Sequence, residues 1–109
     1  MLRVSFARIR PEMEPKLRDW LAQLMVRRAE VLETFAGEGT SQEQAYILPT
    51  SDGPMLVYVM DTQDNERARA AYALSSHAID LEHRAILTEC LGERLRLTPL
   101  YACSTEKLP

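Results

Sequence analysis

The sequence contains no long apolar run. No segment reaches the roughly 20 consecutive apolar residues that a membrane-spanning helix needs. The stretch from Met1 to Arg10 also lacks the unbroken apolar segment of a signal peptide. We therefore expect a cytoplasmic protein that makes no contact with a membrane.

Cysteines and histidines are few, and their spacing matches no common site. Cys90 and Cys103 are isolated, without the C-x-x-C spacing of a zinc or redox pair, which predicts two free, mostly buried thiols. His77 and His83 would lie about 120° apart around a helix, so they do not converge on one metal ion. No P-loop, dinucleotide fingerprint or G-x-S-x-G motif is present. We expect neither a metal nor a cofactor.

An excess of positive charge is also missing. The chain has 13 Lys and Arg against 16 Asp and Glu, so its net charge is −3. Such a surface does not attract phosphate backbones broadly, and we expect no nucleic acid partner. A length of 109 residues without repeats or linkers predicts one domain over 1–103, followed by a short polar tail at 104–109.

Apolar residues recur at spacings that predict the element order β-α-β-β-α-β. Alternation from Leu2 to Phe6 predicts the first strand. Helical spacing from Leu17 to Phe35 predicts one long helix that ends at Gly37-Glu38-Gly39. The remaining elements are expected at 40–48 (strand), 55–60 (strand, after an Asp52-Gly53 turn), 64–74 (helix, capped by Asp64), 78–91 (helix) and 95–103 (strand).

Two helices that each return the chain across one antiparallel sheet predict a ferredoxin-like α+β sandwich with four strands. Residues 55–60 are apolar on both faces of their strand, and Leu95 to Ala102 show the same pattern. A strand that is apolar on both faces is buried on both faces. A second copy of the chain should therefore cover the face without helices, which predicts a homodimer in the form of a dimeric α/β barrel. The alternative is a monomer with a mildly apolar exposed face.

Several segments carry a resemblance to a known family. They are the first strand with its Pro11 turn and Trp20, the segment Val31-Leu32-Glu33-Thr34 with the Gly-Glu residues after it, Glu43, and Ile79-Asp80-Leu81-Glu82-His83 with Glu89-Cys90-Leu91. On these residues the chain resembles an uncharacterised bacterial family of unknown function in the dimeric α/β barrel superfamily, related to antibiotic-biosynthesis-type monooxygenases. The resemblance implies the ferredoxin-like fold and implies no particular activity. Arg28 departs from it, since an apolar residue is expected there.

Two ionisable residues, Arg28 and His83, fall on the apolar faces of the predicted helices. A buried arginine needs a carboxylate, a carbonyl or a ligand anion, and Glu43 or Glu89 is the expected partner. A buried histidine has a lowered pKa and can act as a base. Together they predict a polar cavity between the helices and the sheet. The alternatives are that His83 only packs and that Arg28 extends past the sheet edge to water.

These residues support three hypotheses for function. The first is binding of an unidentified small molecule, with His83, Arg28, Glu43, Tyr58 and Trp20 as candidate ligand-binding residues. The second is a cofactor-independent monooxygenase or isomerase acting on a planar or carbonyl substrate, with His83 as the candidate catalytic base and Arg28 or Tyr58 holding the substrate. The third is a module that only dimerises. An open pocket lined by His83 would favour the first two, and a closed interior would favour the third.

Overall fold

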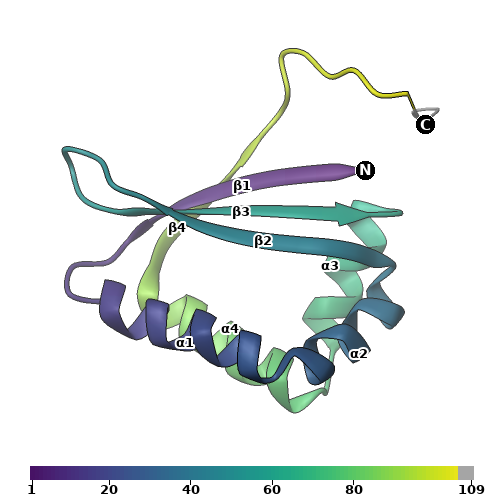
Figure 1. Ribbon diagram of the computed structural model, residues 1–109, viewed down its shortest axis with the longest axis horizontal. Coiled ribbons are helices and arrows are strands. Elements are labelled where there is room, and N and C mark those ends of the chain that lie inside the picture. The colour runs from purple at the N-terminus through teal and green to yellow at the C-terminus, as the bar shows by residue number, and fades with distance from the viewer. Residues whose placement is uncertain (106–109) are drawn as a thin grey trace.

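The chain folds into a four-stranded antiparallel sheet with all helices on one face, as seen in a computed structural model that describes residues 1–105 (Figure 1). The predicted α+β class and the order β-α-β-β-α-β are confirmed, although each helical connection consists of two helices. In chain order the elements are β1 (Leu2–Ile9), α1 (Glu14–Val26), α2 (Arg28–Glu38), β2 (Thr40–Leu48), β3 (Met55–Thr62), α3 (Asn65–Leu74), α4 (Ala78–Cys90) and β4 (Leu91–Leu97).

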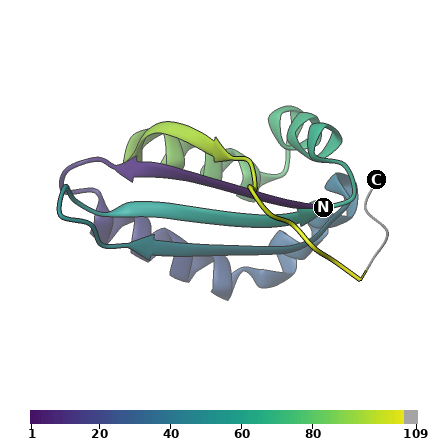
Figure 2. The same cartoon turned by 90° about the horizontal axis from the view of Figure 1, so that it is seen from above.

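The strand order is β2-β3-β1-β4, and every neighbouring pair is antiparallel. The two central strands, β1 and β3, pair from Leu2 opposite Asp61 to Arg8 opposite Met55. All helices lie below the sheet in Figure 1, and Figure 2 presents the opposite, uncovered face. This is the ferredoxin-like arrangement that the sequence predicted. Side chains on the inner face of the sheet therefore meet the helices.

α1 and α2 are separate helices where the sequence predicted one. Arg27 lies between them with φ −94° and ψ 31°, outside the helical region. α2 then ends at Gly39, whose φ of 71° is the left-handed conformation that glycine adopts without steric cost. Arg28 is the first residue of α2, directly after this break, where a helical wheel drawn through both pieces fails. Arg28 is exposed, so the prediction that it lies on the buried face is wrong.

β4 begins earlier and ends earlier than the predicted strand at 95–103. α4 passes directly into the strand, and Leu91 already pairs with Ile9 of β1. After Leu97 the chain leaves the sheet, and Cys103 is exposed. The prediction of mostly buried thiols therefore holds for Cys90 and is wrong for Cys103. Within the predicted tail at 104–109, residues 106–109 lie outside the described part of the chain.

The inner face of β4 is charged rather than apolar. Arg94 pairs with Ala7, and Arg96 pairs with Ser5, and both of these β1 partners are buried under the helices. The apolar pattern predicted for both faces of this strand is therefore wrong on the inner side. The two arginines instead project toward the space between the sheet and the helices, where they line a cavity.

The core lies between the inner face of the sheet and the helices. Leu17 of α1, Leu56 of β3 and Cys90 of α4 are its largest fully buried side chains. Asp64 caps α3 as predicted, accepting hydrogen bonds from the backbone N–H groups of Glu66 and Arg67. None of the helices in the described chain is long and apolar enough to cross a membrane.

The face of the sheet without helices is apolar. Its cross-strand pairs join Val4 to Val59, and Phe6 to both Val57 and Leu95. Along β3 the residues alternate between buried on the helix side and partly buried on this side, so the pattern predicted for 55–60 is confirmed. No element of the described residues covers this face (Figure 2).

Candidate functional site

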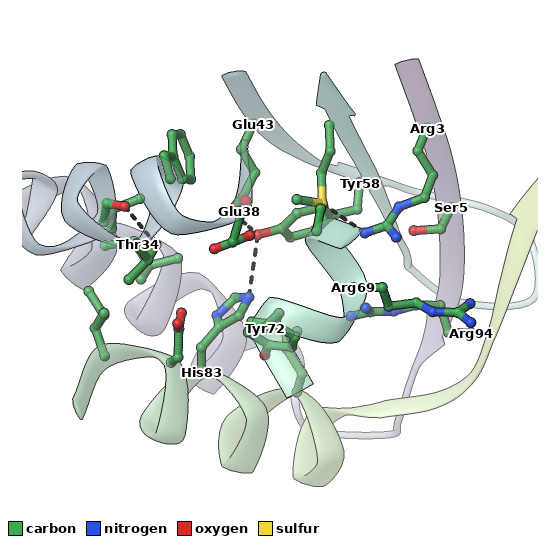
Figure 3. Close-up of a pocket in the computed structure, with 18 of the residues that line it drawn as sticks. Arg3, Ser5, Thr34, Glu38, Glu43, Tyr58, Arg69, Tyr72, His83 and Arg94 are labelled. Carbon is green, nitrogen blue, oxygen red and sulfur yellow. Dashed lines mark hydrogen bonds between the residues drawn. The ribbon is translucent and has the colours of Figure 1, made fainter. Parts of the chain in front are cut away.

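A cavity of about 130 Å³ lies between the sheet and the helices (Figure 3). Every helix and strand described above contributes at least one side chain to its wall. Its apolar lining comes mainly from α2 and α4, including Val31, Phe35 and Ile79. Its polar lining residues are more numerous, and they are Arg3, Ser5, Thr34, Glu38, Glu43, Tyr58, Arg69, Tyr72, Asp80, His83, Arg94 and Arg96.

A chain of hydrogen bonds joins four side chains from four elements at this site. The indole Nε1–H of Trp20 on α1 donates to Nδ1 of His83 on α4, over 2.7 Å. The other ring nitrogen of His83, Nε2, lies 3.3 Å from the hydroxyl of Tyr58 on β3. The Tyr58 hydroxyl in turn donates to the carboxylate of Glu43 on β2. The chain links the helix layer to the sheet across the cavity.

These contacts determine where His83 carries its proton. An indole N–H can only donate, so Nδ1 of His83 must accept, and the proton of the neutral ring is on Nε2. Burial lowers the pKa of His83 to about 4, and the positive charge of Arg94 adds to this effect. His83 is therefore neutral at physiological pH and offers an N–H donor to Tyr58. This geometry does not support the sequence-based hypothesis that His83 is a base, because its one lone pair is already used.

The groups in the cavity that can accept a proton are carboxylates. Burial raises the pKa of Glu38 to about 7, with further contributions from the negative charges of Asp80 and Glu43. Burial also raises the pKa of Glu43, which the hydrogen bond from Tyr58 partly offsets. Asp80 is buried, and its Oδ2 atom has no hydrogen-bond partner within the described structure. No group of three or more His, Cys, Asp or Glu side chains among the described residues is arranged to hold a metal ion.

The structure brings together three of the five candidate residues. His83, Glu43 and Tyr58 line the cavity, and His83 is buried as predicted. Trp20 is buried and does not line the cavity, but it orients His83 through its N–H group. Arg28 is exposed and lies outside the cavity lining. It is the first residue of α2, directly after the break at Arg27.

Sequence reasoning missed most of the polar lining residues, among them Arg3, Glu38, Tyr72, Asp80 and Arg94. A signal existed for the arginines, since Arg3 alternates with Leu2 and Val4, and Arg94 precedes the apolar residue Leu95 in a strand. A charged residue on the inner side of such a strand faces the helices. For Glu38 and Asp80 no such signal existed, because their burial depends on how the helices pack.

Comparisons with known proteins agree with this fold. The structure of Rv0793 from Mycobacterium tuberculosis matches with a TM-score of 0.57 and 24% identity, covering 94% of this chain and 97% of that chain. A proposed antibiotic biosynthesis monooxygenase from Nitrosomonas europaea matches with a TM-score of 0.54 and 16% identity, covering 94% and 92%. NE2512, a protein of unknown function from Nitrosomonas europaea, matches with a TM-score of 0.51 and 19% identity, covering 99% and 92%. These likenesses show the fold alone.

A comparison with curated proteins finds no match. A family model described as a family of unknown function, DUF6176, matches residues 2–108, which is nearly the whole sequence. The resemblance seen in the sequence is thereby confirmed, both for a family of unknown function and for a fold shared with antibiotic-biosynthesis-monooxygenase-like proteins. The chain belongs to the family of unknown function DUF6176.

Proposed function

We propose that the chain binds a small organic molecule in the cavity between its helices and its sheet. The observation that carries the proposal is a pair of buried, unpaired polar atoms at the cavity, Oδ2 of Asp80 and the hydroxyl oxygen of Tyr72. Buried polar atoms in native proteins nearly always have a hydrogen-bond partner, and an unpaired one costs about 1–3 kcal/mol. A bound molecule with polar groups would supply the missing partners.

The size of the cavity suits a compact ligand. An engineered cavity of ~150 Å³ in another protein holds benzene, and the cavity here is similar, at about 130 Å³. Apolar side chains of α2 and α4 would contact the body of the ligand, while the polar lining would orient it. Such a combination of an apolar wall and polar groups directed at the ligand is typical of small-molecule sites.

Filling the cavity tests this function. Val31→Phe adds a large side chain at the cavity wall, whereas Leu32→Phe, on the same helix, adds one at a position that is 49% exposed. A library of small polar fragments would be screened against both variants by ligand-detected NMR. Fragments should bind the wild type and Leu32→Phe and should lose binding in Val31→Phe. If no fragment binds, or if Val31→Phe binds them all normally, the proposal fails, and a module without a ligand becomes the better hypothesis.

We also propose that a second copy of the chain packs against the uncovered sheet face to form a homodimer. That face exposes apolar side chains of the central strands and of β4, among them Leu97 with 53% of its surface exposed. Beyond β4, the extended segment with Leu100 and Tyr101 rises from the sheet on this same side and is almost fully exposed (Figure 1). Exposed apolar surface of this kind marks interaction sites. A partner sheet would bury the face, and the partner's surface would receive the extended segment.

Dimerisation is testable by sedimentation equilibrium. The wild type should have a mass of about 25 kDa, twice the chain mass of 12.4 kDa. Val59→Glu puts a charge at the centre of the uncovered face and should give a monomer, whereas Leu81→Glu, at an exposed position of α4, should remain a dimer. A wild type that is monomeric at micromolar concentration, or a Val59→Glu variant that is still dimeric, contradicts the interface.

Proton-transfer catalysis is a second candidate, and one observation favours it. Glu38 lines the cavity with a pKa of about 7, which is the value that suits a general base at physiological pH. In this reaction the Glu38 carboxylate would remove a proton from carbon next to a carbonyl group and return a solvent proton. Proton NMR of 2-oxobutanoate in D₂O would detect the exchange. Exchange that is absent, or that is unchanged in Glu38→Gln, eliminates this candidate.

A further inference from the structure

Four arginines line the cavity, and three of them come from three separate elements. Arg3 comes from β1, Arg69 from α3 and Arg94 from β4, and Figure 3 shows them on one side of the cavity, with Glu38 on the other. Within the described chain, no carboxylate lies at ion-pair distance from Arg3 or Arg94. Arg69 has only a weak contact of 3.9 Å with Glu66 of its own helix. No carboxylate therefore pairs closely with the guanidinium groups of Arg3 and Arg94, although the negative charges of Glu43 and Glu38 act on Arg3 from beyond ion-pair distance.

Arg3 is the member of this cluster with the least access to water. It is half-buried on a central strand, and the one hydrogen bond of its side chain within the described residues runs from Nη2 to the sulfur of Met60, over 3.0 Å. Thioether sulfur is a weak acceptor, and a guanidinium group has five N–H donors to satisfy. Burial lowers the pKa of Arg3, and the positive charges of Arg94 and Arg69 lower it further, while the negative charges of Glu43 and Glu38 partly offset these effects. On balance the charged form of Arg3 is disfavoured, and an anion nearby would stabilise it.

Arg94 is placed to share such an anion with Arg3. Its guanidinium carbon lies 5.9 Å from the centre of the Tyr58 ring, so the side chain extends over the cavity wall. Arg94 is exposed, which puts it at the mouth of the cavity while Arg3 lies deeper. The two guanidinium groups therefore line one cavity, where a single anion would meet both.

We propose that the ligand of this cavity is a small monocarboxylate whose carboxylate group is bound by Arg3 and Arg94. The proposal rests on the small-molecule function above and names the class of ligand. Guanidinium and carboxylate groups form paired, charge-assisted hydrogen bonds, which are among the strongest in proteins. The apolar part of the acid packs against Val31 and Phe35.

The carboxylates of the cavity favour an anion with a single negative charge. Glu38, Glu43 and Asp80 line the same space as the arginines. Their combined field opposes a second negative charge on the ligand, because like charges at short range repel strongly where water is excluded. Inorganic phosphate and dicarboxylates are therefore disfavoured relative to a monocarboxylate of similar size.

Benzoate, its neutral analogue benzamide and inorganic phosphate are suitable probes. Binding of the two organic probes would be followed by saturation-transfer NMR, and phosphate would be added as a competitor. Benzoate should bind at least about tenfold more tightly than benzamide, since a tenfold ratio needs only about 1.4 kcal/mol. Arg3→Gln and Arg94→Gln should each reduce this ratio toward one. Arg67→Gln changes the net charge equally at an exposed position outside the cavity lining, and it should leave the ratio unchanged.

The outcomes separate this proposal from the small-molecule function. If benzamide binds as tightly as benzoate and Val31→Phe blocks both, the cavity is a binding site but the carboxylate assignment is wrong. The assignment is also wrong if Arg67→Gln weakens benzoate as much as Arg94→Gln, or if phosphate displaces benzoate at a lower concentration than benzoate itself needs. If neither organic probe binds while other fragments bind the wild type and lose binding in Val31→Phe, only the carboxylate assignment is wrong; if no fragment binds at all, both proposals fail. Circular dichroism of each variant confirms folding, and Arg94→Gln retains the test if Arg3→Gln is unfolded.

Discussion

Replacing Glu38 by glutamine removes a carboxylate that is 6% exposed and lies near two other acidic groups, Asp80 and Glu43. The folded protein holds the pKa of Glu38 at about 7, against 4.5 for an ordinary glutamate. Between these pH values the folded state binds a proton that the unfolded chain has released. The stability linked to Glu38 is therefore fully present below about pH 4.5 and is lost as pH rises to 7.

The size of the effect follows from this pKa difference. At ~1.4 kcal/mol for each pKa unit, the ionised Glu38 destabilises the folded state by at most about 3 kcal/mol above pH 7. His83 acts in the opposite direction, because its pKa is lowered from 6.5 to about 4 and stability is lost as pH falls through this range. The two contributions nearly cancel between pH 4.5 and 6.5 in the wild type. Glu38→Gln removes the contribution of Glu38, so the pH dependence due to His83 becomes measurable.

Urea denaturation at fixed protein concentration measures both effects. The unfolding free energy of Glu38→Gln relative to that of the wild type should increase by about 2 kcal/mol as pH rises from about 5 to about 8, because glutamine stays neutral while Glu38 ionises. Within the variant, stability should rise with pH from about 5 to 6.5 as the unfolded histidine loses its proton. Glu33→Gln, at an exposed position of the same helix, is the control and should show no such gain. The reasoning is refuted if Glu38→Gln differs from the wild type by the same amount at both ends of the pH range.

Three further predictions concern the hydrogen-bond chain, the helix break and the core. Trp20→Phe removes the N–H that donates to Nδ1 of His83, so it should destabilise the protein by about 1–3 kcal/mol. It should also change the ¹⁵N chemical shifts of the His83 ring, and unchanged shifts would contradict the assigned tautomer. Arg28→Ala should change the unfolding free energy by at most about 0.5 kcal/mol, because Arg28 is exposed. Arg27→Ala should cost more, because Arg27 forms ion pairs with Glu30 and Glu82. The reverse ranking in urea denaturation would contradict the placement of Arg28. Leu17→Ala should cost about 2–5 kcal/mol in the same assay because the side chain is fully buried, and a cost below about 1 kcal/mol would place it outside the core.

The fold was predictable because its signals are local. The alternation in β1 and β3, the capping residue Asp64 and the left-handed glycine at 39 each depend on a few neighbouring residues. The break between α1 and α2 was not predictable in this way. Arg27 is neither glycine nor proline, and the helical spacing of apolar residues continues on both sides of it.

The candidate site was predictable only in part, and the errors arise where packing between elements, rather than local spacing, decides whether a side chain is buried. His83 lies within α4, an unbroken helix, so its place on the apolar face could be read from the spacing of its neighbours. Arg28 was placed by the same method and is exposed, and it stands directly after the break at Arg27. Phe35, further along α2, lines the cavity as its spacing predicted, so the error from periodicity is confined to the break.

What the sequence determined by itself is the element order, the ferredoxin-like sheet and the burial of His83, since these follow from periodicity within single elements. Only the tertiary structure decided what surrounds His83: the donor on Trp20, the acceptor at Tyr58 and the carboxylate of Glu43, which come from three other elements. The same holds for the chemistry of the site. A ring nitrogen becomes donor or acceptor, and a carboxylate gains or loses its proton, according to neighbours that are distant in the chain, and no local pattern of residues encodes those distances.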